Sequence, residues 1–338
     1  MAYETGTASS LEDLMLAVHT FAVAQGWTSN IYNTTNDWMA INNGSVFVQF
    51  RWDNSNAVAM FQSTGFINTS TAPGNHTNSS GLGQVDATAP YNSTISALST
   101  TSSTTPRMQM RTYSNGPFTA YHLFTDGTTK YIHLAVEVTP GIFTHMSFGT
   151  INKRGDWVGG QYAAGHDSGV SESTIFGHGI NHSADRVNGV NFCIRAEGLP
   201  GQGSGRWLCA RGFSITTGNN SAGDDPGGNP RGEAVPTAFG FGVYANLMPL
   251  AVNPGDGLVP LFPIEVFRKY LPTLDNDQCT LLGTIPGAYT INMKHFDTAA
   301  EFSIGASTFI VLPAHSRGGA GNPRLGRGFR GLAYLKVV

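Results

Sequence analysis

The chain has little charge: Asp, Glu, Lys and Arg make up 12% of its 338 residues, well below the roughly 25% that is usual for soluble domains. Its formal net charge is −3 and no long block of basic residues occurs. Nucleic-acid binding proteins need clustered positive charge, so we expect no nucleic-acid partner. A surface covered mainly by neutral polar groups suits permanent packing against neighbouring subunits.

Cysteine is also scarce, with only Cys193, Cys209 and Cys279. An odd and low number argues against a disulfide framework. Cys193 and Cys209 flank the glycine-rich stretch LPGQGSG, and a hairpin centred on Gly201 would place them opposite each other. We expect a reduced cross-strand pair, with a disulfide as the alternative.

Long hydrophobic runs are missing. The apolar stretch LMLAVHTFAVA near the start of the sequence is too short to span a membrane, and no other segment is long enough. Glu12 and Asp13 precede this stretch and no basic segment stands before it, so we do not expect a signal peptide. The sequence therefore predicts no membrane span.

Glycine, serine, threonine and asparagine are abundant. This composition is typical of short strands joined by tight turns. We predict a mainly β fold with antiparallel, sandwich-like sheets, an N-terminal amphipathic helix and long loops rich in Ser, Thr, Asn and Gly.

The first element is predicted to be the helix. Ser9 and Ser10 can cap it, and Gly26 ends it. Its apolar residues recur with helical spacing and form one stripe: Leu11, Leu14, Met15, Val18 and Ala22. The stripe must be buried against the chain's own β core or against a neighbouring subunit, and we predict an interface through Leu11, Leu14, Met15 and Val18.

From about residue 30 the apolar residues alternate with a period of two, as in a half-buried strand. Val46, Val48, Phe50 and Trp52 would share one face, and residues 57–63 would pair back as a hairpin. Three strands are predicted as a meander over 118–151, and the last strands over 281–293, 299–313 and 331–338. Residues 263–271 (PIEVFRKYL) are predicted as a short helix.

Four parts are predicted along the chain. An N-terminal arm covers 1–27, and a β-rich lobe covers 28–217 with a low-complexity excursion at 63–106. The run GNNSAGDDPGGNPRG (218–232) is the clearest group of structure breakers, so a linker is predicted at 218–234. A C-terminal β-rich lobe follows at 235–338.

No motif carries a specific chemistry. His166-Asp167-Ser168-Gly169 is interpreted as a polar turn, because a catalytic triad needs a geometry that this short stretch does not indicate. GQGSG (201–205) is not followed by the helix that a phosphate loop requires. Glu137 and Asp156 are the best carboxylate pair for a glycoside hydrolase, which is a weak signal.

Two groups of histidines are candidates for metal binding. One is His166, Asp167, His178, His182 and Asp185 in a glycine-rich segment, interpreted as a loop with local hydrogen bonds. The other is His122, His133 and His145 on three successive strands, interpreted as ordinary half-buried strand residues. We therefore predict no catalytic residue, no metal and no cofactor, and we do not expect an enzyme.

The stretch FTHMSFGTINKRGDWVGGQYAAG (143–165) collects charged and aromatic residues around a basic turn. We interpret it as structural, with a contact surface at Lys153, Arg154, Trp157 and Tyr162. Sugar stacking on Trp157, Tyr162, Trp207 and Phe213 stays open as an alternative. A second contact surface is predicted in a glycine-rich run near the end, at Arg317, Arg324, Arg327 and Arg330, with a solvated loop as the alternative.

Three patches resemble virion structural proteins of tailed bacteriophages. They are MAYETGTASSLEDLMLAVHTFAVAQGW at the start, HMSFGTINKRGDWVGGQYAAG in the centre, and LGTIPGAYTINM, FSIGASTFIVLPAHSR and GLAYLKVV towards the end. The resemblance implies a structural subunit of the neck, tail or baseplate region that assembles with copies of itself and other virion proteins. It implies a virion location after assembly in the bacterial cytoplasm. A host-glycan-binding, receptor-binding or decoration protein is the first alternative, and a cell-wall or polysaccharide hydrolase the second.

Overall fold

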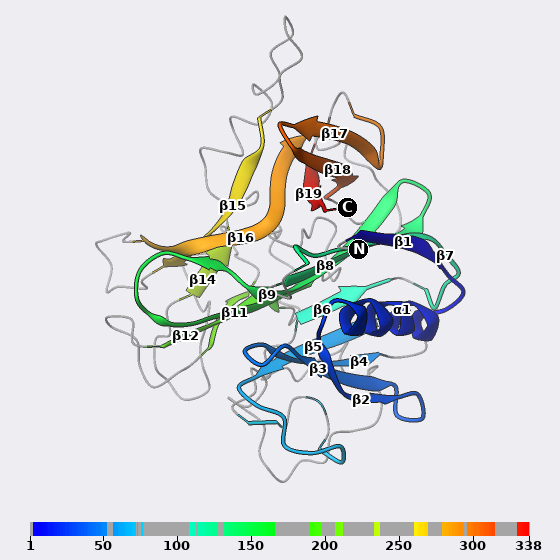
Figure 1. Ribbon diagram of the computed structural model, residues 1–338, viewed down its shortest axis with the longest axis vertical. Coiled ribbons are helices and arrows are strands. Elements are labelled where there is room, and N and C mark those ends of the chain that lie inside the picture. Colours follow the sequence, from blue (N-terminus) through cyan, green and yellow to red (C-terminus); the bar gives the residue numbers. More distant parts are fainter. Residues whose placement is uncertain are drawn as a thin grey trace, which may run out of the picture.

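A computed structural model describes residues 3–52, 57–71, 73, 76–77, 108–112, 114–127, 131–165, 190–197, 207–211, 233–236, 260–269, 279–293, 296–314 and 330–337. This part of the chain contains one helix and two sheets, so the predicted mainly β fold is confirmed (Figure 1). The strands pair antiparallel, except for one parallel contact between β6 and β12.

The first sheet follows the order β1-β7-β8-β9-β11-β12-β6-β5-β4-β3-β2, with β13 beside β12. Its strands are β1 (Tyr3–Ala8), β2 (Thr28–Asn33), β3 (Trp38–Asn42), β4 (Phe47–Trp52), β5 (Ala57–Ser63), β6 (Met108–Arg111), β7 (Phe118–Phe124), β8 (Tyr131–Thr139), β9 (Ile142–Thr150), β11 (Val158–Gly165), β12 (Val190–Glu197) and β13 (Trp207–Arg211). The hairpin of β4 and β5 and the meander of β7, β8 and β9 confirm two predictions.

The second sheet follows the order β14-β15-β16-β19-β18-β17, with β10 beside β16. Its strands are β10 (Asn152–Lys153), β14 (Glu233–Pro236), β15 (Phe262–Lys269), β16 (Cys279–Asn292), β17 (Ala300–Ile304), β18 (Ser307–Pro313) and β19 (Arg330–Lys336). The predicted strands near the end of the chain are all present.

The predicted N-terminal helix is confirmed as α1 (Leu11–Ala24). Ser10 is its N-cap, and the Ser10 side chain accepts a hydrogen bond from the Asp13 backbone amide at 3.1 Å. The chain leaves the helix through Gln25 and then Gly26, whose φ of 85° favours glycine.

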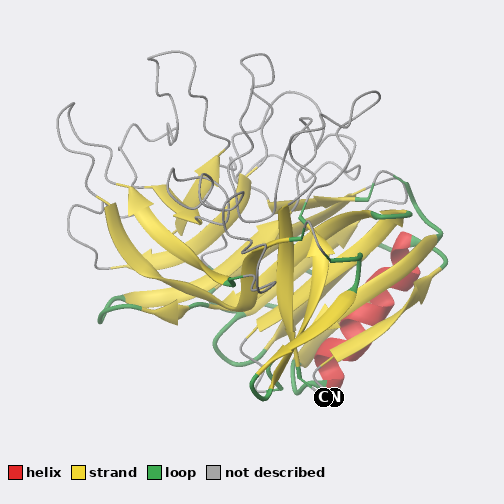
Figure 2. Cartoon of the chain, turned by 90° about the horizontal axis from the view of Figure 1, so that it is seen from above, coloured by secondary structure: helices red, strands yellow, loops and turns green. Residues whose placement is uncertain are grey.

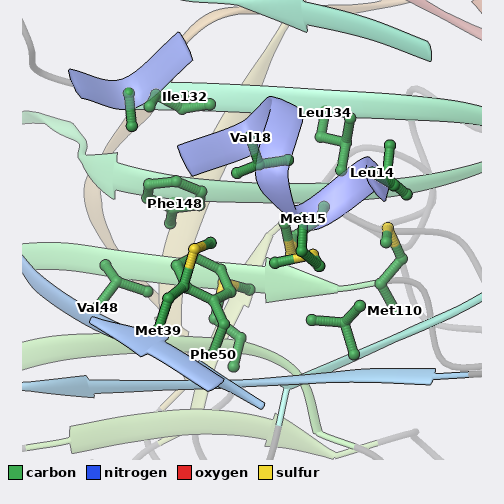
Figure 3. Close-up of a cluster of buried hydrophobic side chains, with 14 of the residues drawn as sticks. Leu14, Met15, Val18, Met39, Val48, Phe50, Met110, Ile132, Leu134 and Phe148 are labelled. Atoms are coloured by element: carbon green, nitrogen blue, oxygen red, sulfur yellow. The ribbon is translucent and has the colours of Figure 1, made fainter. Parts of the chain in front are cut away.

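The first sheet wraps around α1, because both of its end strands, β1 and β2, contact the helix. Figure 1 shows α1 between β1 and β7 on one side and β2 to β5 on the other, and Figure 2 shows it lying along the strands. The apolar side chains that line this space form the helix core, shown in Figure 3. Its members include Leu14, Met15, Val18, Met39, Val48, Phe50, Met110, Ile132, Leu134 and Phe148.

The buried stripe of α1 corrects the predicted interface. Leu11, Leu14, Met15 and Val18 are completely buried in the helix core. Of the two ways to bury the stripe, the chain uses its own sheet, whose end strands β1 and β2 both contact the helix. These four side chains are therefore not available to a neighbouring subunit.

The meander strands have a second apolar face, which packs against the second sheet. Side chains from both sheets form one interlayer cluster. Its members include Phe124, Phe143, Tyr162, Phe192, Ile264, Leu282, Leu332 and Tyr334. The molecule thus has three β layers, with β8 and β9 in the middle and buried on both faces.

Residues 263–271 were wrongly predicted as a helix, because β15 covers Phe262–Lys269. In β15 the buried residues Ile264 and Val266 alternate with more exposed ones, as the period of a strand requires. Pairing with β14 and β16 outweighs the helix propensity of this stretch.

The predicted linker and excursion lie mostly outside the described residues. Residues 218–232 are among them, while Glu233 and Ala234 belong to β14. Of the excursion at 63–106, the structure describes 63–71, 73 and 76–77, where Gly65 forms a bridge with Thr77. Among the described residues, no helix is long and apolar enough to cross a membrane.

Candidate functional site

The basic turn between β9 and β11 is attached to the second sheet. Within it, β10 pairs with β16, and the Arg154 amide donates to the Leu282 carbonyl at 2.8 Å. Lys153 Nζ donates to the Trp157 carbonyl at 2.7 Å and lies 5.3 Å from the centre of the Trp157 ring. Trp157 Nε1 in turn donates to the Arg154 carbonyl at 2.9 Å. The charged and aromatic residues of the turn thus bind one another.

This arrangement corrects half of the predicted contact surface. Trp157 is only 7% exposed and Tyr162 is completely buried, and both belong to the interlayer cluster. Neither ring presents a face on which a sugar could stack. Lys153 and Arg154 are exposed, so their role as a contact surface stays a prediction.

Gly159 shows why the turn is rich in glycine. Its φ of 118° is unfavourable for other residues, and a Cβ atom there would lie 2.3 Å from the Arg195 carbonyl oxygen. Strand β11 can therefore approach β12 closely only with glycine at this position.

The second feature of the site is a chain of hydrogen bonds through His133, in the middle layer. His133 Nε2 lies 2.8 Å from the carbonyl oxygen of Pro286 in β16. A carbonyl only accepts, so Nε2 carries the proton and Nδ1 accepts from Ser147 Oγ at 2.7 Å. Ser147 Oγ then accepts from the Tyr162 hydroxyl at 2.8 Å. The chain connects β11, β9 and β8 to the second sheet.

His145 makes a second link of the same kind. Its Nε2 donates to the carbonyl of Pro313 in β18 at 2.8 Å, and in the neutral imidazole Nδ1 accepts from the Tyr334 hydroxyl at 3.0 Å. The Tyr334 ring stacks on Phe124 with 4.8 Å between the ring centres. Two imidazoles of the middle layer therefore hold two strands of the second sheet by their backbones.

The histidines of strands β7, β8 and β9 were predicted to be half-buried. In the sheet, His122 and His145 lie on either side of Ala135, with which both pair. The burial was underestimated, because His133 and His145 are completely buried and His122 is 7% exposed. His122 Nδ1 lies 3.0 Å from the Tyr3 hydroxyl in β1.

Burial controls the protonation of these groups. Loss of solvation lowers the pKa of His133 to about 4, and it also lowers the pKa of His122. Burial raises the pKa of the Tyr162 and Tyr334 hydroxyls well above the usual value of 10. At neutral pH His122, His133, Tyr162 and Tyr334 are therefore uncharged, which suits their place between two apolar layers.

The pair of Ser147 and His133 superficially resembles part of a hydrolase site. Both ring nitrogens of His133 are already hydrogen-bonded, and Ser147 is completely buried. Glu137, one of the two predicted carboxylates, accepts from Thr119 Oγ1 and from the Gly141 amide, both at 2.7 Å. It therefore stabilises the turn between β8 and β9. Asp156 is exposed in the basic turn.

Other predicted residues are placed only in part. Among the described residues, no group of three or more His, Cys, Asp or Glu side chains could hold a metal ion. His166, Asp167, His178, His182, Asp185 and Phe213 lie outside the described part, as do Arg317, Arg324 and Arg327. Arg330 begins β19 and Trp207 begins β13.

The cysteine hairpin has the predicted register, with Cys193 in β12 opposite Cys209 in β13. Cys193 is disulfide-bonded, which corrects the expectation of a reduced pair. It is also completely buried, within the helix core.

In the part of the chain that the structure describes, the fold and the site thus define a three-layer β protein in which the buried His133 and His145 connect the middle layer to the second sheet. A scan against protein-family models and a search of curated proteins found no match to this chain.

Sequence reasoning missed the roles of Ser147 and Tyr334. The signal in the sequence is the spacing of two residues between His145 and Ser147, which puts them on the same face of a strand. Tyr334 carries no comparable signal, because it reaches His145 from a strand that is 189 residues further along the chain.

Proposed function

We propose that this protein is a structural subunit of a tailed-phage virion, in the neck, tail or baseplate region, and that it acts by protein–protein assembly. The proposal is supported by the resemblance of three sequence patches to such proteins. One structural observation carries it further, namely the outward face of α1, which has no charged side chain beyond Asp13 in the first turn.

A helix on a protein surface normally carries charged side chains on its solvent side. In α1 no Asp, Glu, Lys or Arg occurs from Leu14 to Ala24. Its outward residues are Asp13, Leu16, Thr20, Val23 and Ala24. Leu16 is 46% exposed and Val23 is 43% exposed. Leu16 and Val23 lie two turns apart on the same side of the helix, and exposed apolar side chains that share one side are typical of surfaces that another protein covers.

The polar interior agrees with this role. The hydrogen bonds of His133 and His145 join the β layers, so the polar groups at the centre of the molecule serve its architecture. A rigid body of this kind can present fixed surfaces to its neighbours, which a symmetric assembly requires.

The glycan-binding alternative depended on exposed aromatic rings at Trp157 and Tyr162. Since both rings are buried, the described residues lend it no support. The assembly role is the better explanation of the exposed residues on α1.

Peptide mass spectrometry of gradient-purified phage particles from the source organism tests the proposal. We expect peptides of this chain in a constant ratio to the other virion proteins. Leu16→Lys should lower incorporation, because it places a charge in the covered face of α1. The matched control Ile67→Lys changes a side chain of similar exposure, 53%, outside the helix and should be incorporated normally. Absence of the wild-type chain from the particles would refute the proposal.

A further inference from the structure

The outer face of the second sheet, which points away from the interlayer cluster, is apolar. Neighbouring side chains along a strand point to opposite faces. The residues that alternate with the interlayer residues along β16, β18 and β19 therefore gather on this outer face. With Phe302 of β17, which has no neighbour in the interlayer cluster, they form an outer cluster of Tyr289, Ile291, Met293, Phe302, Phe309, Val311, Ala333 and Leu335, with Leu261 and Phe296 packed beside them. None of these ten side chains is charged.

Strand β18 demonstrates that the sheet is apolar on both sides. Its residues Phe309 to Leu312 form an unbroken apolar run, and all four are buried. In a sheet with one face towards water, apolar and polar residues alternate along each strand, and continuous runs mark strands that are covered on both faces. Over β18 both faces of the sheet are thus covered within the chain itself, by the interlayer cluster on one side and by the partly buried side chains of the outer cluster on the other. The apolar side chain that stays exposed is Ile304, at the edge of the sheet on β17.

The apolar face extends to the edge of the sheet. Within the described residues, β17 pairs only with β18 and is the end strand of the sheet. Phe302 of β17 stacks on Phe309 with 5.4 Å between ring centres, and Ile304 at the end of the strand is 52% exposed. Beyond it, Gly305 has no atom within 4 Å of where a Cβ would lie. Edge strands without charge on their apolar side readily accept another strand.

We infer that β17 is the dimerisation edge of this protein and that it pairs antiparallel with β17 of a second copy across a two-fold axis. A two-fold axis makes every contact reciprocal. With the axis at Phe302, the two Phe302 side chains lie opposite each other. Ala300 then faces Ile304 of the second copy, so a small side chain meets a large one. The two sheets become one continuous sheet, and the two outer clusters join.

The charges of β17 favour a second copy as the partner. The strand has one charged residue, Glu301, whose Oε1 accepts from Lys336 Nζ at 2.8 Å. Because Glu301 neighbours Phe302 along the strand, it points away from the outer cluster. In the pairing centred on Phe302 it lies opposite Ser303 of the second copy, so no carboxylate faces another. An uncharged apolar face also matches its own copy better than it matches a charged partner.

Sedimentation of the purified full-length protein over a range of concentrations tests the inference, with two isoleucine variants. Ile304→Lys introduces a charge beside the proposed contact and should weaken dimerisation by on the order of a hundredfold, the penalty for an unpaired charge in an apolar contact. Ile67→Lys is the matched control, since Ile67 is 53% exposed and Ile304 is 52% exposed. It should sediment like the wild type.

A cross-linking variant checks the register independently. In Phe302→Cys the two new thiols would meet at the axis, so mild oxidation should yield a covalent dimer, whereas Ile67→Cys should remain a monomer on denaturing gels. A monomeric wild type, or a dimer that Ile304→Lys leaves intact, would overturn the inference. Because these measurements use the isolated protein, their failure is separable from the failure of the proposed role in a virion.

Discussion

The helix core and the interlayer cluster are both large and buried, but they are held together differently. In the helix core, aliphatic and aromatic side chains of α1 and both halves of the first sheet pack against one another. In the interlayer cluster, His133 and His145 bind the backbone carbonyls of Pro286 and Pro313 across the layers. Apolar packing alone tolerates small shifts between layers, whereas a hydrogen bond fixes position.

This difference indicates a division of roles. We interpret the helix core as the main source of stability, because more buried apolar residues belong to it than to the interlayer cluster. The interlayer hydrogen bonds determine where the second sheet sits on the first. That position in turn determines where the outer cluster and the edge of β17 lie relative to α1.

The largest effect is expected from Phe148→Ala in the helix core. Phe148 packs edge-on against Trp27 and Phe50, with ring centres 5.4 and 5.2 Å away. Its loss leaves a cavity and should reduce the free energy of unfolding by about 3–5 kcal/mol. Urea unfolding followed by tryptophan fluorescence measures this. A loss below about 1 kcal/mol would show that the helix core is not the main source of stability.

Acidification should weaken the interlayer cluster selectively. The pKa of His133 falls from 6.5 in the unfolded chain to about 4 in the folded protein, so the unfolded state binds more protons below pH 6.5. The contribution of neutral His133 to stability is complete above pH 6.5 and is lost as the pH falls towards 4. The difference between the two pKa values corresponds to about 3 kcal/mol of unfolding free energy.

The free energy of unfolding of wild type and His133→Gln, measured between pH 6.5 and 4, tests this assignment. His133→Gln should lose much of the pH dependence. His19→Gln, at a partly exposed histidine on α1 whose pKa burial lowers as well, lies outside the interlayer cluster and should keep most of the pH dependence. If His133→Gln and the wild type have the same pH profile, the assignment of this effect to His133 is wrong.

Tyr334→Phe removes a single hydroxyl from the second link. His145 Nδ1 would lose its donor while remaining buried, which should cost about 2 kcal/mol. Tyr289→Phe, in the partly exposed outer cluster, is the control and should change little. Thermal unfolding compares the two, and equal effects would argue against a specific role of the link.

The smallest effect concerns the cap of α1. Ser10→Ala removes the acceptor for the Asp13 amide and should cost about 1 kcal/mol. Ser10→Asp preserves an acceptor and should restore most of it. The denaturant midpoints of wild type, Ser10→Ala and Ser10→Asp measure these changes in stability. An unchanged midpoint in Ser10→Ala would contradict the role of the cap.

The regular elements were predictable because their signals are local. The stripe and cap of α1 follow from residues 9 to 26, and the alternation in β4 follows from Val48, Phe50 and Trp52. What the helix stripe packs against was not predictable in this way. The answer depends on β1 and β2, the opposite ends of a sheet that closes around the helix.

The interlayer links escaped prediction for a similar reason. His133 lies opposite Ser147 because the pairing of β8 and β9 shifts by one residue between Glu137 and Thr139. A one-residue shift moves every side chain to the other face, and nothing in the sequence announces it. Trp157 was placed on the surface because it stands in a basic turn. Its burial depends on β16, to which β10 pairs across about 130 residues of chain.

The most direct test of the proposed function is a reconstruction of phage particles from the source organism at a resolution that traces side chains. The account predicts that this chain occurs in the neck, tail or baseplate region with Leu16 and Val23 of α1 covered by another subunit. A particle without this chain, or with the outward face of α1 open to solvent in every copy, would contradict it.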